Sequence, residues 1–145
     1  LYLSEYFDRN RDAYYQQLRV VQETGDWESW LRFFLRGVAE VAEHSLETAS
    51  RVLALRERDR GRIVAAFGNG SGNALRVLEA LFHSPLISVA DVRNLTGLTG
   101  APANRLVARM VAMNLLVEVT GQRRNRYFQY EPYVRLFGED DVPLP

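Results

Sequence analysis

The chain has 145 residues, enough for one domain, or for one small domain with a helical extension. Apolar residues make up 47% and charged residues 25%, values near the globular average, which argues against a disordered chain. Cysteine is absent, which excludes disulfides, thiolate metal sites and cysteine nucleophiles. No apolar run approaches the roughly 18 residues of a spanning helix. We therefore expect no membrane partner and a cytoplasmic location.

The net charge is zero, but the charges are unevenly distributed. Residues 73–137 carry eight arginines and four acids, whereas residues 1–72 carry ten arginines and eleven acids. Residues 138–145 add three acids and no base. All 18 cationic side chains are arginines. Codon bias explains this most simply, although planar guanidinium groups also suit phosphate. Because the chain starts at Leu1 instead of Met, we expect it to be part of a longer or processed protein.

The first 67 residues have the apolar spacing of helices. Residues 1–24 are predicted to form one helix, capped by Ser4 and ended by Gly25, a residue favoured just after a helix. Asp26 is then predicted to cap a second helix that runs to about residue 67. Forty helical residues would span about 60 Å, which is long for a domain of this size. We therefore expect this arm to cross between two bodies.

The second half has shorter elements. Residues 68–72, Gly-Asn-Gly-Ser-Gly, are predicted to form a linker. Three helices are then predicted to begin near Asn73, Ser88 and Pro102, the second with Asp91 completing a capping box. Two strands are predicted at residues 115–120 and 127–130, joined by a polar hairpin tip at residues 121–126.

The order helix, helix, turn, helix and β-hairpin is that of a winged helix-turn-helix. The sequence therefore predicts a mostly α fold with a small β-hairpin wing, in which a helical arm precedes the winged helix-turn-helix. The expected organisation is a helical region at 1–67, a glycine-rich linker at 68–72, the winged domain at 73–137 and an acidic tail at 138–145.

Two stretches of the chain resemble one protein family. Residues 1–35 include Leu-Tyr-Leu-Ser-Glu-Tyr-Phe-Asp-Arg-Asn-Arg-Asp-Ala-Tyr-Tyr-Gln-Gln-Leu and, from residue 25, Gly-Asp-Trp-Glu-Ser-Trp-Leu-Arg-Phe-Phe-Leu. They resemble the end of the Fic (filamentation induced by cAMP) domain, shortly after its catalytic loop. Residues 103–130 resemble the C-terminal winged-helix domain of many bacterial Fic proteins. The two matches come in the family's order and cover most of the chain.

The resemblance implies a parent protein that transfers AMP from ATP to protein hydroxyls, with a divalent metal as cofactor. The family's loop, His-x-Phe-x-(Asp/Glu)-Gly-Asn-Gly-Arg, supplies a base, a metal ligand and an anion-binding turn. This chain has only Phe67-Gly68-Asn69-Gly70, without the histidine, the acid or the following arginine. We therefore expect no catalytic, cofactor-binding or metal residue in this chain, and the missing Fic core as one of its partners.

Arginines on the predicted third helix and wing suggest DNA as the other partner. In a helix-turn-helix the exposed face of that helix enters the major groove, where arginine reads guanine and asparagine reads adenine. Arginines at a wing tip suit phosphates or the minor groove. The candidate DNA-binding residues are Thr99, Ala101, Asn104, Arg105, Arg109, Arg123, Arg124 and Arg126. The alternatives are a solvated surface, or a protein-docking or dimerisation module that binds no DNA.

Aromatic residues in the first 67 positions suggest self-association. We expect them to pack partly on the missing Fic core and to leave an apolar patch, so that the isolated chain forms a homodimer through residues 1–67. The residues concerned are Tyr2, Phe7, Tyr14, Trp27, Trp30, Phe33 and Phe34.

Overall fold

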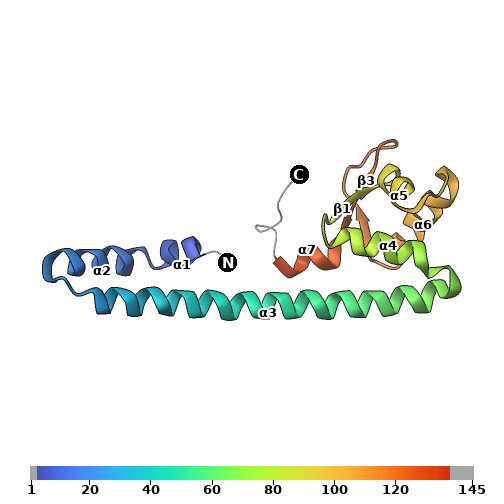
Figure 1. The fold of residues 1–145 in the computed structure, drawn as a ribbon. Helices are drawn as coiled ribbons and strands as arrows, with labels where there is room; N and C mark the ends of the chain where they lie inside the picture. Colours follow the sequence, from blue (N-terminus) through green and yellow to red (C-terminus); the bar gives the residue numbers. More distant parts are fainter. Residues whose placement is uncertain (1–2, 138–145) are drawn as a thin grey trace. The chain divides into compact units, whose positions relative to one another are not determined.

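The computed structural model describes residues 3–137 and separates the chain into two compact units, residues 1–50 and 51–145. Most of the described residues are helical, and three short strands form one antiparallel sheet, so the expected mostly α fold is confirmed (Figure 1). The elements are α1 (Leu3–Arg9), α2 (Arg11–Thr24), α3 (Trp27–Phe67), the 3₁₀ turn η1 (Gly68–Gly70), α4 (Ser71–Leu81), β1 (Leu86–Ser88), α5 (Val89–Thr96), α6 (Gly100–Ala112), β2 (Leu116–Glu118), β3 (Tyr127–Tyr130) and α7 (Glu131–Phe137).

In the first unit, two helices, α1 and α2, precede Gly25, where the sequence predicted one. The helix is interrupted at Asn10, whose side-chain amide donates to the Tyr6 carbonyl (2.9 Å). Asparagine favours such breaks because its side chain competes with the backbone for hydrogen bonds. The expected cap at Ser4 is also wrong, since Ser4 lies inside α1.

The boundary between α2 and α3 follows the sequence prediction. Gly25 takes a left-handed conformation (φ 69°), and its N–H donates to the Val21 carbonyl (2.9 Å). The Asp26 carboxylate accepts the Ser29 N–H (3.1 Å) and hydroxyl (2.6 Å), which satisfies a free donor at the start of α3.

An aromatic cluster forms the interior of the first unit. Phe7 lies 6.1 Å from Phe33 and 6.5 Å from Trp30, measured between ring centroids. Tyr6 is buried directly against Gly37 of α3, where a Cβ atom would lie 2.5 Å from the tyrosine ring. These aromatic residues therefore contact one another, although Trp27 remains 62% exposed. Tyr2 lies outside the described residues.

The second unit begins inside α3. Leu55 and Ile63 belong to its apolar core, and Arg56 Nε donates to Glu79 of α4 (3.2 Å). Residues 51–67 are thus the first helix of this unit, so its boundary lies before the glycine-rich segment. Helix α3 continues through Gly61, because one interior glycine costs only about 1 kcal/mol relative to alanine.

The glycine-rich segment is more ordered than a linker. Gly68 ends α3 with a left-handed φ of 55°, η1 completes the turn, and α4 begins at Ser71. The helix predicted to begin near Asn73 therefore starts two residues earlier, so Asn73 lies in the first turn of α4 and does not cap it; the capping position is Gly70.

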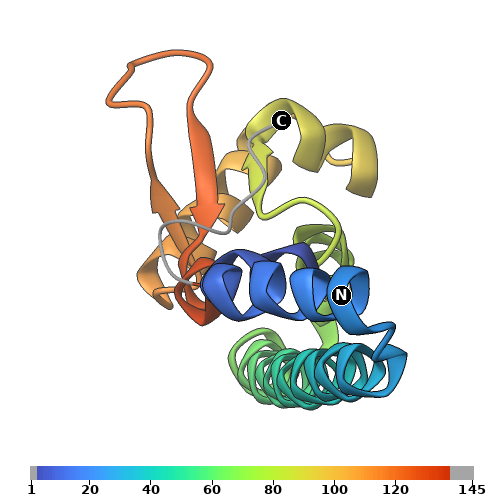
Figure 2. The same ribbon diagram turned by 90° about the vertical axis from the view of Figure 1, so that its left-hand side faces the viewer.

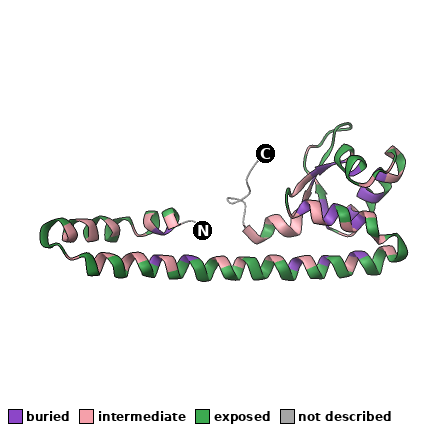
Figure 3. Cartoon of the chain, in the orientation of Figure 1, coloured by how far each residue is buried: buried purple, intermediate pink, exposed green. Residues whose placement is uncertain are grey.

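The rest of the second unit combines the four helices α4, α5, α6 and α7 with the sheet. The strand order is β1-β3-β2, and both pairings are antiparallel, with Ile87 opposite Phe128 and Leu116 opposite Tyr130. Figure 3 shows the buried positions of α4 and of the strands. The core residues include Val77, Leu78, Leu81, Val92, Leu106, Met110, Leu115, Phe128 and Tyr130.

Local signals place most element ends of the second unit correctly. Ser88 and Asp91 form the predicted capping box of α5, and Gly97 (φ 73°) ends that helix. Asn114 takes a left-handed conformation after α6 (φ 54°), as asparagine does more readily than most residues. The strand predicted at 115–120 is shorter, and α7 was not predicted. The predicted acidic tail at 138–145 lies outside the described residues. No described helix combines the length and apolarity needed to cross a membrane.

Candidate nucleic-acid interface

The candidate site is built on α5, α6 and the loop between β2 and β3. The turn after Gly97 leads into α6, whose buried face contains Ala103, Leu106 and Met110. The opposite face of α6 is therefore left exposed. The loop at residues 119–126 extends away from the body of the second unit (Figures 1 and 2). Asn125 takes a left-handed φ of 52°, which turns the chain at the loop tip.

A shallow hollow of about 470 Å³ lies between the loop, the beginning of α5 and the beginning of α6. Its polar side chains come from three separate segments, so it is a product of the tertiary fold. The residues that line it are Ser88, Val89, Ala90, Arg93, Gly100, Asn104, Arg123, Arg124, Asn125, Arg126 and Tyr127.

Four of the predicted residues meet at this hollow: Asn104, Arg123, Arg124 and Arg126. The Asn104 amide donates one hydrogen bond to the Gly100 carbonyl (2.8 Å). A side-chain amide has a second N–H and an oxygen acceptor, so Asn104 can still offer the donor–acceptor pair that adenine requires. The Arg126 guanidinium lies 5.4 Å from the centroid of the Phe128 ring, which holds it at the base of the loop.

Three more predicted residues are exposed on α6 without lining the hollow. Thr99 occupies the capping position, and Ala101 lies in the first turn. Arg105 is exposed, and no ion pair or hydrogen bond holds its side chain among residues 3–137. All three are therefore accessible to a partner that lies along α6.

Among the predicted residues, Arg109 instead contacts the end of α3. Its guanidinium lies 4.1 Å from the centroid of the Phe67 ring and donates a hydrogen bond to the Ala66 carbonyl. Both partners belong to the last turn of α3, where free carbonyl groups attract cations. Arg109 therefore connects α6 to α3 and is not directed to the hollow.

Arg93 and Tyr127 line the hollow, although the sequence analysis did not select them. Arg93 is on the exposed face of α5, one residue after buried Val92. Its position on α5, the helix that precedes α6, could have identified it from the sequence. Tyr127 would have been harder to identify as a site residue from the sequence, since tyrosine is common in β-strands.

Two acids near these groups in the sequence, Asp91 and Glu118, have hydrogen-bond partners of their own. The Asp91 carboxylate accepts hydrogen bonds from the Ser88 N–H (2.9 Å) and hydroxyl (2.7 Å). The Glu118 carboxylate accepts from the Thr120 hydroxyl and N–H. These hydrogen bonds hold the pKa of Glu118 below its ordinary value. The bond from the Thr120 hydroxyl has the largest effect, and the positive charge of Arg126 adds to it. Arg93, Arg123 and Arg124 form no ion pair with an acid of the described residues.

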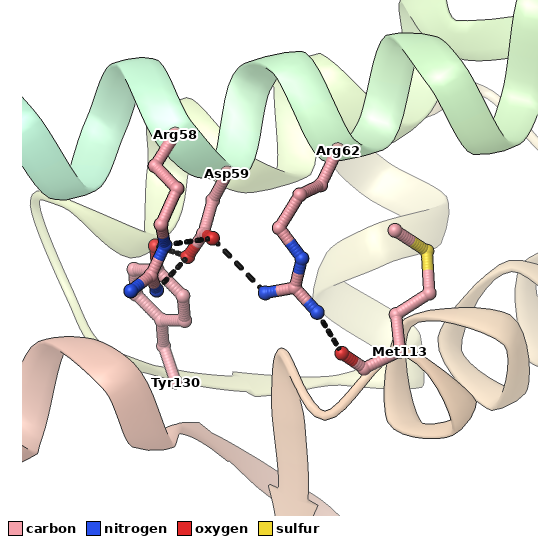
Figure 4. Close-up of polar contacts among 5 residues, drawn as sticks. All are labelled: Arg58, Asp59, Arg62, Met113 and Tyr130. Atoms are coloured by element: carbon pink, nitrogen blue, oxygen red, sulfur yellow. Dashed lines mark hydrogen bonds and ion pairs between the residues drawn. The ribbon is translucent and has the colours of Figure 1, made fainter.

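A buried acid connects α3 with other segments of the second unit (Figure 4). Asp59 of α3 is fully buried and accepts hydrogen bonds from Arg58 (2.9 Å), Arg62 (3.0 Å) and the Tyr130 hydroxyl (2.7 Å). Arg62 also donates to the Met113 carbonyl at the end of α6. One carboxylate thus connects α3 with the end of β3 and, through Arg62, with the end of α6.

The ionised form of Asp59 is favoured by this network. Burial raises the pKa of Asp59, but the hydrogen bonds from Arg58, Tyr130 and Arg62 outweigh burial and hold the pKa below its ordinary value. Burial and the neighbouring carboxylate raise the pKa of the Tyr130 hydroxyl, which therefore remains a donor. The Asp59 carboxylate is thus a structural connection, and both of its oxygens accept hydrogen bonds.

The described residues contain no cluster of three or more His, Cys, Asp or Glu side chains of the kind that could hold a metal ion. Comparison with known proteins adds no assignment: no protein-family model matches the chain, and no curated protein matches it.

Proposed function

We propose that the second unit is a winged helix that binds DNA through the exposed face of α6, the hollow and the loop between β2 and β3. The observation that carries this proposal is the gathering of Arg93, Arg123, Arg124 and Arg126 around one hollow. Guanidinium groups form bidentate hydrogen bonds with phosphate oxygens. Half of the eight arginines in residues 73–137 lie at this one site.

The arrangement separates two kinds of contact. The four arginines surround a concave surface that suits the phosphate backbone, and phosphate contacts fix the register of a protein on DNA. Asn104 and Arg105 lie on the exposed face of α6, where side chains can contact base edges in the major groove. Arg109 takes no part, because it is engaged with the end of α3.

The proposal extends to the longer parent protein of which this chain would be a part. The resemblance of residues 1–35 and 103–130 to Fic proteins supports a chain that forms the C-terminal part of such a protein. The missing upstream part would then transfer AMP from ATP to protein hydroxyls, with ATP and a divalent metal as its cofactors. The winged unit would serve that enzyme as a regulatory region that binds DNA in the cytoplasm.

The test of DNA binding is a fluorescence-anisotropy titration of the chain with duplex DNA at two salt concentrations. Phosphate contacts release counterions, so affinity should fall steeply with salt. The triple variant Arg123→Ala, Arg124→Ala and Arg126→Ala should weaken binding to all sequences and reduce the salt slope by about 2 to 3. The single variant Arg105→Ala should cost about 1–3 kcal/mol at preferred sites only.

A charge-matched control separates a local site from a general electrostatic effect. The variant Arg9→Ala, Arg11→Ala and Arg19→Ala removes the same charge from the first unit and should leave DNA affinity unchanged. Equal losses in the two triple variants, or no binding by the unaltered chain at low salt, would refute the DNA interface. Capture of a protein partner through residues 51–137 without DNA binding would instead favour the docking module.

A further inference from the structure

Helix α3 carries an exposed apolar stripe within the first unit. Its members recur at intervals of three and four residues, which places them on one face of the helix. They are Leu31, Leu35, Ala39, Ala42, Leu46 and Ala49, and every one is exposed. The exposed fractions of the three leucines are 51%, 60% and 69%. The stripe is about 27 Å long and contains no charged residue.

The opposite face of α3 is already occupied. Gly37 contacts Tyr6, and Phe33 contacts Phe7, so this face is directed to α1. Gly37 is about 200° around the helix from Leu35, on the basis of 100° per residue. The apolar stripe is therefore separate from the aromatic cluster, and packing inside the first unit leaves it exposed.

Charged side chains border one side of the stripe in a definite order. Arg32 and Arg36 lie beside its first half, and Glu43 and Glu47 lie beside its second half. All four lie between about 60° and 120° around the helix from Leu35. This border thus carries basic side chains towards the start of α3 and acidic ones further along.

Both arginines of this border already have partners within one copy. Arg32 pairs with Glu28 (2.6 Å) and Arg36 with Glu40 (3.7 Å), in exposed ion pairs one helical turn apart. Such exposed pairs contribute only about 0.3–0.5 kcal/mol each, so the arginines can exchange or share these partners with acids of a second helix at little cost.

We propose that the stripe binds a second copy of this chain, with the two α3 helices antiparallel. In an antiparallel pair the charged border of one copy faces the charged border of the other, running in the opposite direction. Basic Arg32 and Arg36 then meet acidic Glu47 and Glu43 of the second copy. In a parallel pair the charged border would face the uncharged side of the second helix, which carries Phe34, and this complementarity would be lost.

The spacing of the charges fits the spacing of the leucines. Arg32 and Glu47 are equally far from the point between residues 39 and 40, and so are Arg36 and Glu43. The middle of the stripe, halfway between Leu31 and Ala49, falls at residue 40. One two-fold axis at this point therefore places both ion pairs and both stripes in register. The alanines near this point allow the two helices to approach closely.

Analytical ultracentrifugation of the 145-residue chain tests the pairing. The unaltered chain should sediment as a dimer. Leu46→Glu should raise the dissociation constant at least about 100-fold, because two carboxylates would be buried in apolar surroundings. Leu95→Glu, which alters a leucine that is 40% exposed on α5, should remain dimeric. A monomeric unaltered chain, or equal dissociation of the two variants, would overturn the proposal.

Disulfide crosslinking tests the orientation, because the chain has no cysteine of its own. Ala39→Cys lies next to the proposed axis and should form an intermolecular disulfide on mild oxidation. Ala49→Cys should not, because its copies would be separated by about 28 Å along the helices, far beyond the Cα separation of about 7 Å that a disulfide allows. Crosslinking of Ala49→Cys at the same rate as Ala39→Cys would overturn the antiparallel arrangement.

Charge reversal tests the bordering pairs. Arg32→Glu with Arg36→Glu should weaken the dimer, since four carboxylates from each copy would then line the border. The further changes Glu43→Arg and Glu47→Arg should restore it, because they re-create complementary charges in the same chain. Failure of the fourfold variant to recover, with unchanged helix content by circular dichroism, would show that the borders do not face each other.

Discussion

Gly37 shows how one missing side chain positions a helix. The absence of a Cβ atom lets the Tyr6 ring lie against the α3 backbone, and Tyr6 is one of two buried apolar side chains among the described residues of the first unit. The other is Val41. A larger residue at position 37 would therefore displace α1 from α3.

Gly37→Ala should destabilise the first unit. The added Cβ would lie 2.5 Å from the ring, so Tyr6 must move, and overpacking of this kind costs about 1–3 kcal/mol. The intrinsic preference of helices for alanine offsets part of that cost. Because Trp27 and Trp30 both lie in the first unit, tryptophan fluorescence in a urea titration reports this effect.

Gly61→Ala is the matched control on the same helix. Nothing lies within 4 Å of the Cβ position at Gly61, so the change should stabilise the chain by about 0.5–1 kcal/mol through helix preference alone. A loss of stability at both glycines, or at neither, would show that the contact with Tyr6 does not matter.

Asp59 makes the stability of the second unit depend on pH. Its pKa is held below the ordinary 3.8, so the unfolded chain binds the proton more tightly than the folded chain. The stabilising contribution is therefore complete above about pH 4 and is lost as the pH falls through the folded pKa. Asp59→Asn should lower the free energy of unfolding at neutral pH by about 1–3 kcal/mol.

Urea titrations followed by circular dichroism at about pH 6 and about pH 3 would measure this dependence. The decrease in the free energy of unfolding between the two pH values should be smaller in Asp59→Asn than in the unaltered chain. Tyr130→Phe removes one hydrogen bond but retains both arginine contacts, so most of the pH dependence should persist. An unchanged dependence in Asp59→Asn would assign acid sensitivity to other carboxyl groups.

At the scale of elements, the second half of α3 matters most, because it belongs to the second unit. Leu55 and Ile63 are part of the same core as α4 and α6, and Asp59 supplies the partner of Tyr130. A chain of residues 51–137 should therefore fold, whereas residues 73–137 should be less stable and less cooperative in thermal melts. Removal of two buried aliphatic side chains alone costs several kcal/mol. Equal melting temperatures for the two chains would contradict this assignment.

At the scale of the whole molecule, the two units have cores of very different size. The core of the second unit contains sixteen buried residues, whereas Tyr6 and Val41 are the buried apolar side chains among residues 3–50. Stability follows the apolar area removed from water, so the first unit should unfold first.

In a urea titration of the Leu46→Glu variant, which removes self-association, tryptophan fluorescence should change before circular dichroism completes its change. Tryptophan reports the first unit alone, while circular dichroism reports helices of both units. Coincident transitions would indicate that the continuous helix α3 makes the chain unfold as one cooperative system.

The sequence by itself determined features that depend on neighbouring residues. Gly25, Gly97 and Asn114 take left-handed conformations, and Ser88 with Asp91 forms a capping box, because these preferences are local. The helical character, the three helices after residue 70 and the strand at residues 127–130 were predicted for the same reason, whereas the break at Asn10 and helix α7 were not.

Only the tertiary structure decided which side chains act together. Arg105 and Arg109 lie four residues apart on α6, yet Arg109 is engaged by the end of α3, a segment remote in sequence. Arg93 lies beside the arginines of the loop between β2 and β3 for the same kind of reason. Asp59 lies four residues from both Leu55 and Ile63, on the buried face of α3, but a carboxylate at such a position is ordinarily exposed unless a partner is supplied by another segment. Periodicity identifies the exposed face of a helix, but the partner of each face depends on contacts between distant segments.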